Sequence, residues 1–165
     1  MPPTLVDDAG AAPRDPTYVT ATVAGHMFGV PIERVHDVFN VGRITPIPLT
    51  PPEVAGLSNL RGRVVTMLDL RARLGGTAGR GTMALGIEAG PESFGLFVDA
   101  VGEIMKLPAA SAAETPVHLD SRWAELARGV HQLAEGILVV LDVDAVLLSI
   151  RRAITRDPVP LRSLP

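Results

Sequence analysis

The sequence predicts a mainly β protein that consists of small barrels closed by a single C-terminal helix. Short β-branched runs recur between turn signals about every ten residues, the spacing of sandwiches and small barrels. Helical periodicity is convincing only near the C-terminus, so strands do not alternate with helices as in βαβ units. No strong sequence repeat is visible, yet two sets of about five strands would suit two small barrels.

The N-terminal half supplies the first strands. Residues 18–24 and 27–31 flank a tight turn and predict a hairpin. Residues 35–41 alternate, so Val35 and Phe39 share one face, while the neighbours His36 and Asp37 point to opposite faces. A proline-rich connection follows, and then a short buried strand over residues 64–68.

The C-terminal half supplies a second hairpin, over residues 83–87 and 93–98, around Gly90 and Pro91. Residues 101–107 continue as a strand with a bend or bulge at Gly102, and residues 137–141 read as a buried strand. Asp142 is a plausible N-cap for the closing helix. The apolar stripe of that helix comprises Val143, Val146, Leu147, Ile150 and Ile154.

Composition narrows the class of protein. The ends, residues 1–16 and 156–165, are proline-rich and read as flexible, which leaves a folded domain over residues 17–155. The chain has no cysteine, which excludes disulfides, thiolate metal sites and cysteine nucleophiles. It has no apolar run long enough to span a bilayer, and its formal net charge is −3. We therefore expect a cytoplasmic protein without direct membrane contact.

Catalytic and metal-binding patterns are missing from the sequence. The four histidines lie far apart, so surface or half-buried imidazoles are expected in place of a metal site. No serine stands in a nucleophile motif, and the glycines of residues 75–81 lack phosphate-loop spacing. Asp142 and Asp144 are explained by helix capping. We expect no enzyme activity, no cofactor and no metal.

Five arginines form a basic cluster: Arg61, Arg63, Arg71, Arg73 and Arg80. A nucleic-acid-binding barrel would add exposed aromatic side chains for stacking, and none occurs between Phe39 and Phe94. The cluster is therefore expected to pair with acids of this chain or of a protein partner, and not with nucleic acid.

One stretch combines charge with an apolar strand. Asn59, Leu60, Arg61 and Gly62 precede the apolar residues 64–68, and Asp69, Leu70 and Arg71 follow them. Charges beside a buried strand need partners. Asp37 is the candidate partner of Arg61, and Asp69 either pairs with Arg71 or caps a short helical turn. The Asp37–Arg61 pair could fix barrel closure, form the charged edge of a docking surface, or do both.

Several ordered motifs make the chain resemble the CheW-like domain family of bacterial chemotaxis coupling proteins over roughly residues 17–150. The motifs are Phe28–Val35, Val35–Val38, Ile44–Pro48, Gly56–Gly62 with Asp69–Arg71, Phe94–Val101, and Gly129–Val130 with Leu141–Val143. The family usually has Glu in place of Asp37 and often Pro in place of Thr66. The shorter Asp37 implies a pair with Arg61 that forms over a shifted backbone or through water.

The resemblance implies two intertwined, five-stranded, SH3-like barrels without catalytic activity. It implies an adaptor that couples the signalling tip of a chemoreceptor to the regulatory domain of the CheA histidine kinase, at receptor arrays on the inner face of the membrane. The receptor-facing positions would be Val35, Asp37, Arg61, Val98 and Asp99, and kinase contacts would fall on apolar loop ends. A scaffold in another receptor–kinase pathway, for motility or development, is the alternative.

Overall fold

The computed structural model describes residues 15–73, 82–116, 119 and 121–156. Most of the predicted leader and tail, the glycine-rich residues 75–81 and His118 lie outside these described residues.

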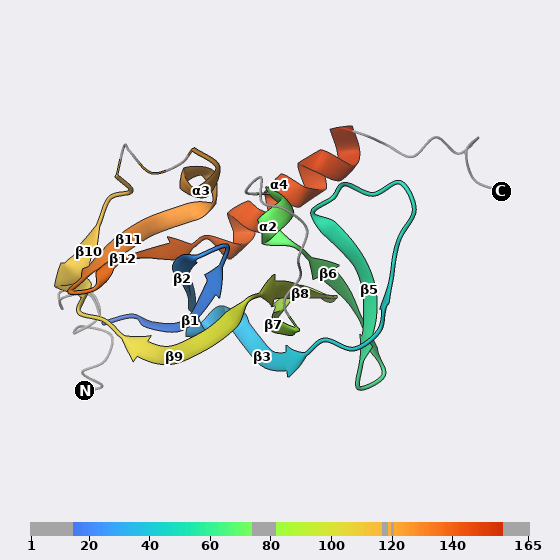
Figure 1. Ribbon diagram of the computed structural model, residues 1–165, viewed down its shortest axis with the longest axis horizontal. Coiled ribbons are helices and arrows are strands. Elements are labelled where there is room, and N and C mark those ends of the chain that lie inside the picture. The colour runs from blue at the N-terminus through green and yellow to red at the C-terminus, as the bar shows by residue number, and fades with distance from the viewer. Residues whose placement is uncertain (1–14, 74–81, 117–118, 120, 157–165) are drawn as a thin grey trace, which may run out of the picture.

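Twelve strands of the described chain form two mixed sheets (Figure 1). The first sheet forms barrel 1, in which the strand order is β10 (Ala112–Ala113), β11 (Ala127–Leu133), β12 (Gly136–Leu141), β2 (His26–Pro31), β1 (Thr17–Val23) and β9 (Ala100–Lys106). The second sheet forms barrel 2, in which the strand order is β3 (Val35–Asn40), β7 (Met83–Ala89), β8 (Glu92–Val98), β6 (Arg63–Leu68), β5 (Val54–Leu60) and β4 (Ile44–Thr45). Each SH3-like barrel thus has the five main strands expected, plus one strand of two residues.

The two barrels exchange strands, which makes them intertwined. β2 belongs to barrel 1, but the chain continues through the 3₁₀ turn η1 (Ile32–Arg34) into β3 of barrel 2. β8 belongs to barrel 2, and the chain continues directly into β9 of barrel 1. Barrel 2 is therefore made from the middle of the chain, and barrel 1 from its two ends.

Both barrels follow one pairing plan. Each contains a single parallel pair, β12 with β2 or β6 with β8, between antiparallel hairpins. Phe28 pairs with Val139 and Ala21 in barrel 1 as Phe94 pairs with Thr66 and Ile87 in barrel 2. Register shifts fall at matching places in β9 and β3, and again in β11 and β5. Structural equivalence therefore exists without an obvious sequence repeat.

Capped helices follow the matching strands β6 and β12. Asp69 Oδ1 accepts from the Arg71 amide at 3.0 Å at the start of α2 (Leu70–Arg73). Asp142 Oδ1 accepts from the Ala145 amide at 3.0 Å at the start of α4 (Val143–Arg156). Side-chain acceptors of this kind satisfy amides that have no partner within the helix. The capping role predicted for Asp142 is confirmed.

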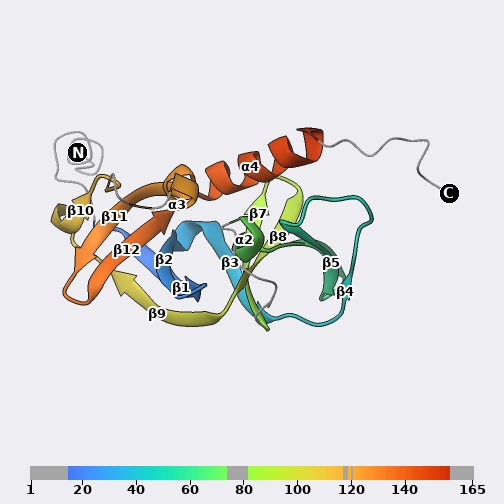
Figure 2. The same cartoon turned by 45° about the horizontal axis from the view of Figure 1, so that its top comes forward.

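The long helix α4 begins at the junction of the barrels, after β12, and extends over the top of barrel 2 (Figures 1 and 2). Its buried face lies in the same apolar cluster as α3 (Ser121–Leu126) and strands from both barrels. No helix in the described part of the chain is long and apolar enough to cross a membrane.

The largest apolar cluster is shared by the two barrels. It joins Phe28 and Leu141 of barrel 1 with Leu68 and Phe94 of barrel 2. Each barrel keeps a smaller cluster of its own, with Phe39 and Met67 in barrel 2 and Tyr18, Leu107, Leu138 and Val140 in barrel 1. Burial of a contiguous apolar surface is the main stabilising term, so the shared cluster holds the barrels together.

Candidate docking site

The β5–β6 hairpin ends in a turn with unusual backbone angles. Leu60 faces Arg63 in the register, and the two residues between them, Arg61 and Gly62, have φ angles of 53° and 83°. Asn59 Oδ1 accepts from the Gly62 amide at 2.9 Å and stabilises the turn. Positive φ is costly for a side chain such as arginine, and strained residues cluster at functional sites. The turn makes Arg61 a candidate functional residue.

Arg61 pairs directly with Asp37 across the seam between the hairpin and β3. Arg61 Nη1 lies 3.0 Å from Asp37 Oδ2, and the other Asp37 oxygen accepts from the Val38 amide at 2.8 Å. The predicted partnership is confirmed, and no water is needed to bridge it. The Arg61 side chain is 76% exposed, so the pair is available at the surface.

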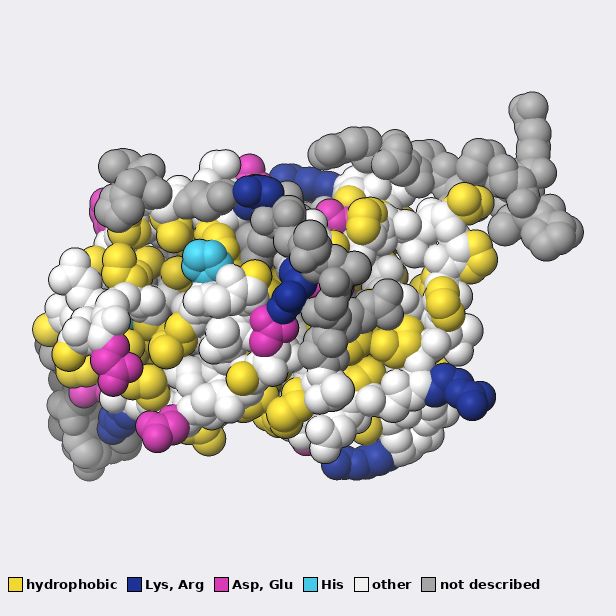
Figure 3. Space-filling model, viewed as in Figure 1, with side chains coloured by type: hydrophobic (Ala, Val, Ile, Leu, Met, Phe, Trp, Pro, Cys, Tyr) yellow, Lys and Arg dark blue, Asp and Glu magenta, His cyan; other side chains and the backbone are white. Residues whose placement is uncertain are grey.

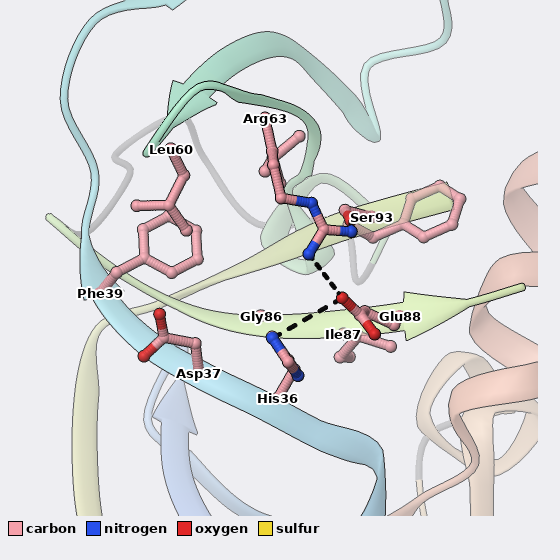
Figure 4. Close-up of a pocket in the computed structure, with 11 residues that line it drawn as sticks. His36, Asp37, Phe39, Leu60, Arg63, Gly86, Ile87, Glu88 and Ser93 are labelled. Carbon is pink, nitrogen blue, oxygen red and sulfur yellow. Dashed lines mark hydrogen bonds and ion pairs between the residues drawn. The ribbon is translucent and has the colours of Figure 1, made fainter. Parts of the chain in front are cut away.

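A β-bulge shifts the backbone on the acidic side of this pair. Val35 faces Ile87, but Asp37 faces the next residue, Gly86, so His36 is an extra residue in the ladder. His36 and Asp37 consequently line the same small cavity, of about 30 Å³ (Figure 4). The expectation that these two side chains point to opposite faces is wrong, because it assumed an unbroken strand.

A second ion network surrounds the cavity. Arg63 Nη1 lies 2.8 Å from Glu88 Oε1, and Arg63 Nη2 donates to Ser93 Oγ at 2.8 Å. His36 Nε2 lies 3.6 Å from the same Glu88 oxygen, and Figure 4 shows Glu88 between the His36 imidazole and the Arg63 guanidinium. The hydrogen bond from Arg63 holds the pKa of Glu88 below its usual range. The network ties the hairpin to β7 and β8.

Asp99 and Arg71 form another contact, at the junction of the barrels. Asp99 pairs with the Arg71 guanidinium and also accepts from the Ala24 amide at 2.8 Å in the β1–β2 turn. Asp69 therefore caps α2, whereas Arg71 pairs with Asp99. Three arginines of the basic cluster, Arg61, Arg63 and Arg71, thus pair with acids of this chain, as predicted. The side chains of Arg73 and Arg80 lie outside the described residues.

The two predicted valines have different surroundings. Val35 is partly buried and packs against the shared core. Val98 is 1% exposed and lies inside that core. A direct contact between Val98 and a partner is therefore ruled out by burial, and the residue acts as packing beneath Asp99.

The sequence analysis missed an ion pair between η1 and α4. Both guanidinium nitrogens Nη1 and Nη2 of Arg34 donate to Asp144 oxygens at 3.0 Å. This fork holds the pKa of the Asp144 carboxyl below its usual range. The two residues are far apart in sequence, so no local pattern could have found the pair.

A buried histidine was also missed. His131 is 1% exposed, with Nε2 2.9 Å from the Tyr18 hydroxyl and Nδ1 2.8 Å from Ser111 Oγ. Ser111 donates its proton to the Pro108 carbonyl, so Nδ1–H must donate to Ser111 and Nε2 must accept from Tyr18. Burial lowers the pKa of His131 and raises that of Tyr18. The expectation of a surface or half-buried imidazole is wrong for His131.

No cluster of three or more potential metal-ligating side chains occurs among the residues that the structure describes. The arrangement around Arg61 is thus an exposed, charged hairpin tip beside an apolar barrel. Such a surface can recognise a protein segment with complementary charge.

The chain matches known proteins over most of its length. The family model of the CheW-like domain matches residues 17–151. The chain is 27% identical to the chemotaxis protein CheW of Klebsiella aerogenes, over 80% of this chain and 81% of that protein. It is 31% identical to the chemotaxis protein CheW of Rhizobium meliloti, over 79% of this chain and 86% of that protein.

A solved structure shares the fold. The crystal structure of the scaffolding protein TtCheW from Thermoanaerobacter tengcongensis has a TM-score of 0.70 and 27% sequence identity, over 78% of this chain and 90% of that one. Sequence motifs, strand-exchanged barrels and the family match agree. This chain therefore belongs to the family of CheW-like domains.

Proposed function

We propose that this chain is a non-catalytic adaptor that couples chemoreceptor signalling tips to the regulatory domain of the CheA histidine kinase. The family match and the names of the two chemotaxis relatives support a coupling role in chemotaxis. The relative from Thermoanaerobacter tengcongensis is called a scaffolding protein, which supports binding without catalysis. These names favour chemotaxis over the motility or development pathway.

The observation that carries the proposal for this chain is the exposed Asp37–Arg61 pair on a strained hairpin. The Asp37 carboxylate orients the guanidinium, and most of the Arg61 side chain remains accessible to a partner. A helical receptor tip that presents apolar side chains and a carboxylate would suit an arginine beside a partly apolar surface. Arg61 is proposed as the contact residue and Asp37 as its positioning residue.

Val35 and Asp99 complete the proposed receptor surface in different ways. Val35 supplies apolar surface next to the bulge of β3. Asp99 ties Arg71 to the β1–β2 turn and so holds the two barrels in one orientation. Val98 is left out because it is buried.

The proposed place of work is the cytoplasmic side of the membrane, in receptor arrays. Single contacts of this size are weak, and repeated contacts within an array raise the overall affinity. Coupling then requires no chemistry in this chain, only different affinities for the signalling states of its partners.

A titration with a receptor signalling-tip fragment and a CheA regulatory domain from the same organism tests the proposal. Wild type is compared with Arg61→Ala, Asp37→Ala and the double variant, after circular dichroism confirms folding. Arg152→Ala is the matched control, because it removes an exposed arginine from α4, away from the hairpin.

Wild type and Arg152→Ala should bind both partners, and Arg61→Ala should lose at least about tenfold in affinity for the receptor alone. The double variant should be no weaker than Arg61→Ala, since Asp37 acts through Arg61. Wild type that binds neither partner, even when both are mixed, would overturn the coupling function. Equal losses for Arg152→Ala and Arg61→Ala would overturn the site.

A further inference from the structure

We propose that barrel 1 has its own docking groove, which binds a protein segment carrying arginine or lysine between apolar residues. The groove lies between β9 and the tip of the β11–β12 hairpin and has a volume of about 460 Å³. Its apolar lining includes Met27, Met105 and Leu133, and its acidic lining consists of Glu103 and Glu135. This inference does not rest on the receptor-coupling function.

The groove is the counterpart in barrel 1 of the small cavity beside Arg61. β9 and β3 pair with their neighbours in the same register, which makes Glu103 equivalent to Asp37 and Met105 equivalent to Phe39. The β11–β12 and β5–β6 hairpins also match, so Leu133 is equivalent to Leu60. The two seams therefore share a backbone plan and can be compared position by position.

Barrel 2 closes its seam with its own arginines. Arg61 reaches Asp37 on the edge strand, and Arg63 reaches Glu88, which leaves a cavity of about 30 Å³. The register places Ala134 and Gly136 of barrel 1 where barrel 2 has Arg61 and Arg63. The seam of barrel 1 keeps the acid but lacks the cation that would close it.

The two acids of the groove have no cationic partner among the described residues. Neither Glu103 nor Glu135 takes part in an ion pair of the described chain, and strand alternation directs Lys106 to the face opposite Glu103. Acidic side chains are visible at this end of barrel 1 around β9 (Figure 3). Two nearby carboxylates beside apolar surface attract a cationic side chain.

The edge of β9 adds backbone contacts. β9 is the last strand of its sheet, so one edge of its backbone has no strand neighbour. Thr20 Oγ1 donates to the Glu103 carbonyl at 2.6 Å and fixes the bulge beneath the acid. An extended segment or hairpin could therefore add backbone hydrogen bonds to its charge and apolar contacts.

The probe for the test is a cyclic peptide with the sequence of residues 58–65, the hairpin tip that fills the equivalent seam of barrel 2. Binding to the full chain is followed by isothermal titration and by amide chemical shifts. A peptide with both arginines replaced by glutamine is the control ligand. The protein variants are Glu103→Gln, Glu135→Gln and Ala134→Arg, with Glu114→Gln as a matched loss of an exposed acid in the same barrel.

The arginine peptide should shift amides of β9 and the β11–β12 hairpin, and its affinity should fall about threefold to tenfold for each glutamine variant in the groove. Ala134→Arg should abolish binding, because its guanidinium would pair with Glu103 as Arg61 pairs with Asp37 in barrel 2. Glu114→Gln should bind as wild type does, and raised salt should weaken binding.

Three results would overturn the inference. The first is that the glutamine peptide binds as well as the arginine peptide. The second is that the shifted amides lie outside the groove. The third is that Glu114→Gln weakens binding as much as Glu103→Gln does. Sedimentation of the full chain without peptide would also measure whether the protein associates with itself. Self-association that Glu103→Gln abolishes would identify a second copy as the occupant and reject a different partner.

Discussion

The β5–β6 hairpin of barrel 2 ends in Arg61 and Gly62, whereas the equivalent β11–β12 hairpin of barrel 1 ends in Ala134 and Glu135. The first turn has positive φ at both positions and presents a cation to Asp37. The second has no positive φ at Ala134 or Glu135 and leaves an open groove. The comparison shows that a few hairpin residues give one backbone plan two different surfaces, one closed by an ion pair and one open.

The interiors differ as well. Ser58 on β5 and His131 on β11 occupy equivalent register positions. Ser58 donates to the Arg43 carbonyl at 3.1 Å, while His131 bonds to Tyr18 and Ser111. Barrel 1 therefore contains a titratable group where barrel 2 contains a neutral hydroxyl, and only barrel 1 should respond to mild acid at this position.

The shared core gives the largest expected effect. Leu68 and Leu141 are equivalent and fully buried in the cluster that joins the barrels. Replacing either with alanine should cost about 2–5 kcal/mol of unfolding free energy through the cavity that it leaves. Urea denaturation would measure the loss. A much smaller cost for one of the two would break the equivalence of the barrels in the core.

A glycine-to-alanine substitution should destabilise the protein unequally at the two matching bulges. Gly56 has φ of 145°, and a Cβ there would lie 2.4 Å from the Thr45 carbonyl oxygen. A Cβ at the equivalent Gly129 would lie 3.2 Å from the Ala113 oxygen. Gly56→Ala should lower the unfolding free energy by about 1–3 kcal/mol or more, and Gly129→Ala by less. Equal values in urea denaturation would contradict this difference.

Acid pH is expected to have a moderate effect on the stability of the folded protein. Burial lowers the pKa of His131 from the ordinary 6.5, so below that pH the unfolded chain binds more protons than the folded one. Stability should fall as pH drops from 6.5 through the folded pKa, and it should be full above 6.5. His131→Gln should flatten this dependence, because it removes the buried imidazole. Urea denaturation of wild type and His131→Gln at pH 8 and pH 5 would measure the difference in unfolding free energy.

The smallest stability effect is expected at Arg61. Arg61→Asn places Asn-Gly in a turn with two positive φ angles, the residues that this turn prefers. It also removes an exposed ion pair worth about 0–1 kcal/mol. Stability should stay unchanged or rise by up to about 1 kcal/mol, while receptor affinity falls. A destabilised Arg61→Asn variant would mean that the arginine serves the fold more than binding.

Patterned segments were predictable from the sequence. The strands that begin the chain and the closing helix follow alternation and helical periodicity, and Asp142 sits where a cap is needed. The strands β5 and β11 were not predicted, because each contains glycine and polar residues and neither alternates cleanly between polar and apolar positions. Their pairing partners, and not their own propensity, make them strands.

The candidate site was predictable only in part. Family motifs pointed to Asp37 and Arg61, but the burial of Val98 and the bulge at His36 depend on how strands meet. His131 offers no signal, because its partners Tyr18 and Ser111 come from distant segments. Contacts that tertiary packing creates between distant residues leave no trace in a local pattern.

The exchange of strands has a consequence for synthesis on the ribosome. β1 and β2 are translated first, but β9 and β12, their neighbours in the sheet, end at Lys106 and Leu141. At about 5–20 residues per second, the first hairpin waits roughly 5–20 s for its partners. Meanwhile Phe28, which is fully buried in the finished fold, has no core to enter. The nascent chain therefore exposes an apolar hairpin that is a natural client for chaperones.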